Sequence, residues 1–338
     1  MDTESNHLLP DHDATLTSAT PTPTPPTLRK IFIGKDGLRA GWSMLIFMAL
    51  FAGLMYCANL IGHKYRPPAP KSALPDSEIS LRRGLISEAI PFLVVLLVTW
   101  IMAKIERRPV SVYGFGGSRR LPYFLAGLAW GVTCLSLLIL TLVETGYLVI
   151  DTRLLFGSDI LRYGVIWLLG FLLVGLLEEY VTRGYVQYTL TRGLAGLYQW
   201  AFKTGHSEAL GFWTAAAIFS FLFGFGHGKN PGESPIGMLS AGLGGMVFCF
   251  SLWRTGSLWW AIGFHTSWDW AQSFLCGVAD SGLMVQHHLL GTHAVGKPIL
   301  SGGTTGPEGS IFIVGILAVI ILIIHFTLPR TQHARVFG

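Results

Sequence analysis

Charged residues are scarce in this sequence. Asp, Glu, Lys and Arg together make up only 13% of the 338 residues, whereas a soluble domain carries roughly 25%. Apolar residues account for 51% of the chain, and its mean hydropathy is +0.51. So few charges could not cover the surface of a water-soluble protein of 37.0 kDa. The composition therefore excludes a soluble globular enzyme and a disordered scaffold, and it predicts a multi-spanning membrane protein.

Cysteine is equally scarce. The four cysteines lie in apolar stretches, without the CxxC or CxxH spacing of a metal site or a disulfide framework. We expect them to be packed or lipid-facing thiols. The net charge of +5 comes from short basic clusters beside apolar runs, and such clusters are typical of contact with lipid headgroups. The sequence thus predicts membrane lipid as a partner and excludes nucleic acid.

Long apolar runs dominate the rest of the chain. Because a spanning helix needs about 20 apolar residues, they predict an all-α bundle of about eight transmembrane helices. The expected spans are residues 42–62, 85–103, 121–143, 163–183, 209–226, 235–253, 256–278 and 311–328. Residues 184–202 are mixed in character and predict an amphipathic helix instead.

The connecting segments divide the chain into regions. Residues 1–28 are polar and rich in Pro and Thr, which predicts a disordered tail. Residues 29–150 hold the N-terminal membrane helices, and 311–338 hold the final helix and a short tail. Glycines and a proline between 281 and 310 predict an exposed, flexible loop. Small residues at 237, 241 and 245 share one helix face and predict close helix packing.

Ionisable residues inside the spans fall at three places. LLEEYVTRGY closes the fourth span and contains Glu178, Glu179 and Arg183. FSFLFGFGHGK ends near His227, and WWAIGFHTSWDWAQ carries His265 and Asp269. Charges at such depth are costly and tend to mark function.

Helical spacing gives these residues a geometry. Glu179 and Arg183 stand at i and i+4, the spacing of a side-chain ion pair, as do His265 and Asp269. Adjacent residues lie about 100° apart on a helix, so Glu178 faces elsewhere and is free to point at a polar centre.

The residues alone are compatible with several functions. Together, the carboxylates and imidazoles suit the activation of a water molecule. Each motif taken singly also fits a structural role: a helix end at the interface, an interfacial histidine, or a hydrogen bond between helices. A membrane transporter or proton relay would need the same buried groups, and a catalytically idle immunity or scaffold protein could retain the motifs.

The three motifs resemble those of a known family. EEYVTR fits Glu-Glu-x-x-x-Arg, FGFGH fits Phe-x-x-x-His, and HTSWD fits His-x-x-x-Asn/Asp. In this order, on apolar segments, they resemble the CPBP family of intramembrane proteases, also called Abi or CAAX protease-like proteins. The resemblance covers about residues 163–275 and marks 151–280 as the protease core. It implies an intramembrane endopeptidase acting on a membrane-associated peptide or protein, in a bacterial inner membrane.

The resemblance also implies residue roles. Glu178 and His227 would activate the water, His265 and Asp269 would support the oxyanion, and Glu179 with Arg183 would stabilise the site. Prenyl-protease members usually carry Asn where this chain has Asp269, and an ionised carboxylate cannot donate a hydrogen bond to an oxyanion. Asp269 must therefore be protonated, orient His265, or bind a metal.

The metal question stays open at this point, because the family is described both as metalloproteases and as glutamate-dependent proteases. Glu178, His227, His265 and Asp269 form a donor set that would suit zinc. Using Glu178 as a ligand removes the best general base, so we favour a mechanism without a cofactor.

Overall fold

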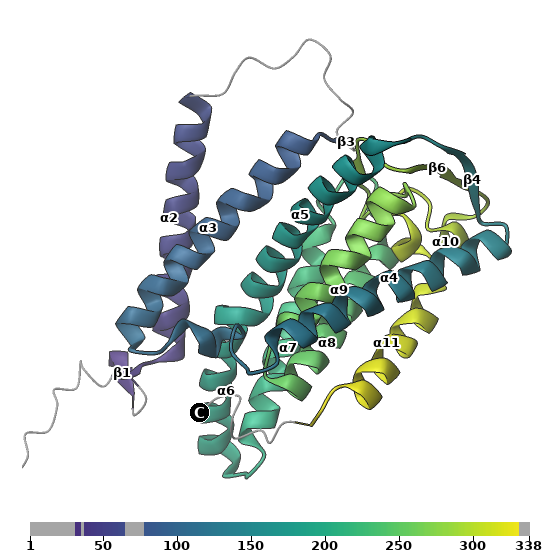
Figure 1. Ribbon diagram of the computed structural model, residues 1–338. Helices are drawn as coiled ribbons and strands as arrows, with labels where there is room; N and C mark the ends of the chain where they lie inside the picture. Colours follow the sequence, from purple (N-terminus) through teal and green to yellow (C-terminus); the bar gives the residue numbers. More distant parts are fainter. Residues whose placement is uncertain (1–30, 35–36, 65–77, 331–338) are drawn as a thin grey trace, which may run out of the picture.

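The computed structural model describes residues 31–34, 37–64 and 78–330. The tail expected at 1–28 lies outside these residues. Helices make up most of the described chain (Figure 1). They are α2 (Ala40–Lys64), α3 (Leu81–Glu106), α4 (Arg120–Glu144), α5 (Ser158–Tyr180), α6 (Val186–Phe202), α7 (Ser207–His227), α8 (Pro235–Thr255), α9 (Trp259–Trp270), α10 (Pro298–Ser301) and α11 (Ile313–Thr327). The all-α membrane bundle expected from the composition is confirmed.

Six segments of the described chain are long and apolar enough to cross a membrane, so this is a multi-pass membrane protein. They correspond to the first six expected spans, with α5 and α6 merged into one segment, Ser158–Phe202. The last two expected spans are shorter helices: α9 has 12 residues and α11 has 15. Residues 271–278 leave the α-helix because a π-helical turn, η3 (Ala271–Leu275), ends it.

Helix α9 lies at the centre of the bundle, against α4, α5 and α8 (Figure 1). Glycines allow its backbone to approach α4 closely. A Cβ at Gly127 of α4 would collide with the carbonyl oxygen of Trp260, and one at Gly263 of α9 would collide with that of Phe124. Nearly every residue of α9 is consequently buried, which places its polar side chains in the protein interior.

The segment expected to form an amphipathic helix at 184–202 continues α5 through a second π-helical turn, η2 (Val181–Tyr185). Gly184 has a non-helical backbone conformation, with φ −84° and ψ −113°. The first residues of α6 are buried, whereas Trp200 and Phe202 near its end are exposed. The segment after the fourth span therefore does differ from it, as expected, and the two are joined by a kink within one continuous helical segment.

The exposed, flexible loop expected at 281–310 is present only in part: residues 293–299 are exposed, whereas much of the rest is ordered and partly or fully buried. Its backbone pairs with distant parts of the chain: β5 (Met284–Val285) lies parallel to β3 (Glu78–Ile79), and β6 (Leu290–Ala294) lies antiparallel to β4 (Leu148–Arg153). Ser301, Thr305 and Ser310 are buried. The glycines that suggested flexibility form tight turns instead, with positive φ at 282, 302, 303 and 306. We call residues 276–310 the cap segment.

Short strands and 3₁₀ turns complete the described chain. A two-stranded pairing of β1 (Ile33–Gly34) with β2 (Gly37–Leu38) precedes α2. A 3₁₀ turn, η1 (Val110–Tyr113), joins α3 to α4, and another, η4 (Pro307–Gly309), closes the cap segment before α11. Because η4 lies beside α8, the end of the cap segment returns to the helices that carry the candidate site.

Candidate active site

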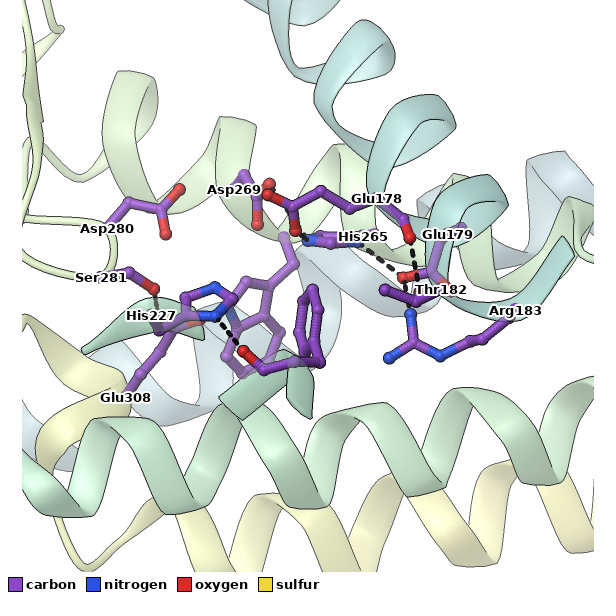
Figure 2. A network of polar contacts seen from close by, with 12 residues as sticks. Glu178, Glu179, Thr182, Arg183, His227, His265, Asp269, Asp280, Ser281 and Glu308 are labelled. Carbon is purple, nitrogen blue, oxygen red and sulfur yellow. Dashed lines mark hydrogen bonds and ion pairs between the residues drawn. The ribbon is translucent and has the colours of Figure 1, made fainter. Parts of the chain in front are cut away.

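Three helices bring the expected site residues to one place. Glu178 and Glu179 are near the end of α5, His227 is the last residue of α7, and His265 with Asp269 lies on α9. Glu178, His227, His265 and Asp269 all line one cavity of about 200 Å³. The convergence inferred from three separate motifs is therefore present in the fold (Figure 2).

The cavity has a polar and an apolar side. Much of its remaining wall is formed by apolar and small residues of α5, α8, α9 and α11, including Phe171, Val174, Ala241, Gly244, Phe264, Ile313, Leu317 and Ile320. Three further carboxylates line it: Glu88 of α3 and Asp280 and Glu308 of the cap segment. Among the described residues that line the cavity, none is a lysine or arginine.

Glu179 and Arg183 form the expected ion pair behind the cavity. Arg183 Nη1 lies 2.5 Å from Glu179 Oε1, and both side chains are almost fully buried. The Arg183 Nε–H also donates to the Gly245 carbonyl oxygen at 3.3 Å. Its guanidinium carbon lies 5.0 Å and 5.4 Å from the ring centres of Phe223 and Phe248, close enough for cation–π attraction.

Small residues on α8 leave room for this arginine. A Cβ at Gly245 would stand 2.8 Å from Arg183 Nη2 and 3.0 Å from Ser220 Oγ. The sequence predicted that the small residues at 237, 241 and 245 allow close helix packing. At 245 the absence of a side chain instead leaves space for the Arg183 guanidinium, which comes from η2. The close approach of α7 to α8 is made at Gly224 and Gly242.

His265 lies between the two glutamates of α5. Its Nδ1 is 2.9 Å from Glu179 Oε1, and its Nε2 is 3.7 Å from Glu178 Oε2. Asp269, one helical turn along α9, places Oδ2 at 3.5 Å from the same Nε2. The shared face expected for His265 and Asp269 is present. The contact between His265 and Glu179 was not predicted, because it joins residues 86 positions apart.

The hydrogen bonds of the two histidines define which nitrogen carries a proton. The Nδ1 of His227 is 2.8 Å from the Phe223 carbonyl oxygen. A carbonyl oxygen only accepts, so this nitrogen is the N–H donor. In the neutral ring Nε2 is then the free acceptor. His265 likewise donates from Nδ1 to the Glu179 carboxylate, and its Nε2 faces two carboxylates.

The residues do not form a recognisable metal site in the described part of the chain. No three His, Cys, Asp or Glu side chains there stand together as ligands. In each histidine Nδ1 is engaged, by Glu179 in His265 and by the Phe223 carbonyl in His227, which leaves Nε2 as the ring nitrogen that faces the cavity side. The zinc set of Glu178, His227, His265 and Asp269 that the resemblance suggested is thus not a ligand grouping in the described part of the chain, and no step below is derived through a metal.

Two acidic side chains outside the membrane spans have raised pKa values. Burial raises the pKa of the Asp280 carboxyl well above its usual range, and the charges of Asp269 and Glu308 raise it further. Burial also raises the pKa of Glu233, in the turn between α7 and α8. The part of the cavity wall at Asp280 is thus an environment that disfavours additional negative charge.

Sequence reasoning missed Glu88, Asp280 and Glu308. Glu88 carried a signal, since it is an acidic residue inside the expected second span. Asp280 and Glu308 carried none, because they lie in a polar, glycine-rich stretch where acidic residues are ordinary. Glu308 accepts hydrogen bonds from Trp268 Nε1 at 2.8 Å and from Ser281 Oγ at 3.2 Å, and Figure 2 shows it on the His227 side of the site.

Helices α5 and α9, which carry the predicted carboxylates of the site, change to π-helical geometry just beyond them. Turn η2 starts two residues after Glu179, and η3 starts two residues after Asp269. Such turns are rare and occur frequently at functional sites. Here η2 carries Arg183, so the altered winding sets the direction from which the guanidinium reaches Glu179.

Comparison with known proteins agrees with the motifs. A family model described as Type II CAAX prenyl endopeptidase Rce1-like matches residues 161–271. This segment contains Glu178, Glu179, Arg183, His227, His265 and Asp269, and the match confirms the resemblance of that segment to CAAX protease-like proteins. A comparison with curated proteins found no match, and neither did one with solved structures.

Proposed function

We propose that this membrane protein, whose residues 161–271 match the CAAX-type protease family, is an intramembrane endopeptidase. The observation that carries the proposal is the convergence of Glu178, His227 and His265 on one cavity from three helices. A carboxylate and two imidazoles beside a cavity of about 200 Å³ provide the groups needed to activate a water molecule and to stabilise an oxyanion.

Glu178 is the proposed general base. Its side chain is 31% exposed and reaches the cavity, whereas Glu179 is fully buried and paired with Arg183. Only Glu178 of the two can therefore meet a water molecule and a substrate. His227 supports the same water through Nε2, the acceptor that its bond to the Phe223 carbonyl leaves free.

The chemical step balances without a further reactant. Water oxygen forms a bond to the peptide carbonyl carbon, and the water proton passes to the Glu178 carboxylate. The carbonyl π electrons move to the oxygen and form the oxyanion. When the oxyanion collapses, the C–N bond breaks and Glu178 returns the proton to the leaving nitrogen. One peptide bond and one water become a carboxylic acid and an amine.

His265 is the proposed donor to the oxyanion. Glu178 and Asp269 flank its Nε2 at 3.7 Å and 3.5 Å, and Glu179 binds its Nδ1. Three surrounding carboxylates favour a protonated imidazole, whose Nε2–H donates to a developing negative charge. Asp269 then orients and charges His265. This role removes the difficulty that an ionised carboxylate cannot itself donate to an oxyanion.

Support for a membrane-associated substrate comes from the position of the cavity among membrane helices and from its apolar side, formed partly by Ile313, Leu317 and Ile320 of α11. Membrane lipid is the medium in which such a substrate would arrive. The bacterial inner membrane is the location that the family resemblance suggests.

The proposed chemistry requires no cofactor. Elemental analysis of the purified protein tests that part of the proposal.

The experiment is peptide cleavage in proteoliposomes. Purified protein is incubated with a set of membrane-associated peptides, and products are identified by mass spectrometry. We expect cleavage by the wild type and its loss in Glu178→Ala and His227→Ala, with folding checked by thermal unfolding. Asp159→Ala, at the first turn of α5 and away from the cavity lining, is the matched control that keeps activity. Full proteolysis by both active-site variants would overturn the proposal.

The same preparation separates the alternatives. A proton relay predicts pH-driven flux across the proteoliposome membrane without peptide products. An idle scaffold predicts neither products nor flux, and a cellular phenotype that survives Glu178→Gln. Either pattern would replace the protease assignment.

A further inference from the structure

The cap segment, which lies beyond the matched residues 161–271, contributes a carboxylate to the cavity wall. Glu308 of η4 lines the cavity together with Asp280 and Ser281. Its two oxygens have different partners: Oε1 accepts from Trp268 Nε1 at 2.8 Å, and Oε2 accepts from Ser281 Oγ at 3.2 Å. One side chain thereby joins η4, the last turn of α9 and the start of the cap segment; Figure 2 shows Glu308 close to Ser281.

Glu308 binds the side chain of Trp268, which forms part of the cavity wall. Trp268 precedes Asp269 directly and follows His265 by three residues on α9. Its indole is only 6% exposed, stacks on Phe264 at 5.8 Å, and lines the cavity. An indole N–H is only a donor, so without Glu308 this buried group would lose the acceptor that fixes the ring against the wall.

The cap segment holds Glu308 firmly in place. The Gly282 N–H donates to the Thr305 carbonyl at 3.0 Å, and Thr304 Oγ1 donates to the Gly232 carbonyl in the α7–α8 turn at 2.7 Å. The Leu289 N–H donates to the Phe274 carbonyl at 2.7 Å. The first bond joins the two ends of the cap segment, and the other two tie it to the α7–α8 turn and to η3. The carboxylate of Glu308 therefore approaches Trp268 from a fixed backbone.

Keeping a carboxylate at this position has a cost. The Glu308 charge lies close enough to Asp280 to raise that residue's pKa, and like charges in a half-buried site repel each other. A neutral acceptor would avoid this repulsion while making the same bond to an indole. The charge of Glu308 and its hydrogen bonds can therefore be tested separately. Glu308→Gln removes the charge and keeps groups that can make both hydrogen bonds.

We propose that Glu308 is a positioning residue of the proposed protease: by holding the Trp268 indole, it shapes the substrate-binding wall beside His265 and Asp269. The inference rests on the proposed function. Glu308 acts through Trp268 and has no part in the proton transfers assigned to Glu178. Since the wall contacts substrate in the ground state and the transition state alike, its loss raises KM more than it lowers kcat.

The test compares four variants in the proteoliposome assay: Glu308→Ala, Glu308→Gln, Trp268→Phe, and Glu308→Ala combined with Trp268→Phe. The glutamine keeps both bonds, because its carbonyl accepts from the indole and its amide donates to the Ser281 oxygen. We expect Glu308→Ala to raise KM about tenfold, corresponding to one buried donor left without its acceptor. Glu308→Gln stays near wild type, Trp268→Phe resembles Glu308→Ala, and the double variant is no worse than either single variant.

A second readout does not depend on catalysis. In protein labelled with ¹⁵N at tryptophan, the Trp268 indole signal is identified by its loss in Trp268→Phe. We expect its proton to exchange faster with solvent in Glu308→Ala and at the wild-type rate in Glu308→Gln.

The outcomes separate the two claims. A wild-type protein that cleaves no peptide overturns the proposed function. An active wild type whose Glu308→Ala variant keeps KM, kcat and indole exchange unchanged overturns the positioning role alone. The positioning role is also overturned if Glu308→Gln is as impaired as Glu308→Ala, which would assign the effect to charge, or if the effects of Glu308→Ala and Trp268→Phe add in the double variant.

Discussion

The buried ion pair of Glu179 and Arg183 gives a sharp prediction about stability. In Arg183→Met a flexible apolar side chain takes the place of the guanidinium between Phe223 and Phe248, where a thioether packs well. Glu179, which is 0% exposed, then keeps its charge without its cation. Breaking a buried pair in this way costs about 3–5 kcal/mol. His265 Nδ1 still donates to Glu179 Oε1 at 2.9 Å, so we expect a value near about 3 kcal/mol.

The double variant Glu179→Gln with Arg183→Met removes the stranded charge. Replacing a buried pair by neutral groups of similar volume is often neutral or stabilising, so we expect most of the lost stability to return. The free energy of unfolding is measured by SDS titration in mixed micelles. Asp151→Asn is the control, because the Asp151–His293 pair at 2.9 Å is half exposed and its loss costs at most about 1 kcal/mol. A harmless Arg183→Met, or a double variant as unstable as the single one, would refute the reasoning.

Two further predictions concern space and titration. Gly245→Ala places a Cβ 2.8 Å from Arg183 Nη2 and should lower the free energy of unfolding by about 1–3 kcal/mol. A Cβ at the neighbouring Gly244 meets no heavy atom of the described residues within 4 Å, so Gly244→Ala should be neutral or stabilise; equal losses in both would contradict the account. Because the pKa of Asp280 is raised in the folded protein, the folded state binds more protons than the unfolded state above about pH 4, the ordinary aspartate value. The contribution of Asp280 to stability is therefore fully present below that pH and is lost as pH rises through the raised pKa. Asp280→Asn should remove this contribution and make the unfolding free energy fall less steeply over that range; an unchanged slope would refute the assignment.

Contacts within one helix were predictable from the sequence. Glu179 with Arg183 and His265 with Asp269 stand at i and i+4, and both pairs are in contact. Glu178 precedes Glu179 and was expected to face away from the ion pair, toward a polar centre; it does line the cavity. Hydropathy also located the six segments of the described chain that are long and apolar enough to span a membrane, because apolar composition over about 20 residues is a local property.

Contacts between distant segments were not predictable. His265 reaches Glu179 across 86 positions and Trp268 reaches Glu308 across 40, and both depend on how the helices and the cap segment pack. Glycine in the cap segment suggested an exposed loop, whereas the fold uses Gly282, Gly302 and Gly306 in tight, buried turns. At 256–278 hydropathy predicted one span, but a π-helical turn and Gly277, with φ 59°, end the helix early.

One measurement tests the central claim most directly: single-turnover cleavage of a membrane-associated peptide in water enriched in ¹⁸O, by the wild type and by Glu178→Gln. The account predicts that the new carboxyl terminus gains one ¹⁸O atom and that Glu178→Gln slows this incorporation by about 10²-fold or more, the contribution of a general base. Incorporation by Glu178→Gln at the wild-type rate would contradict it.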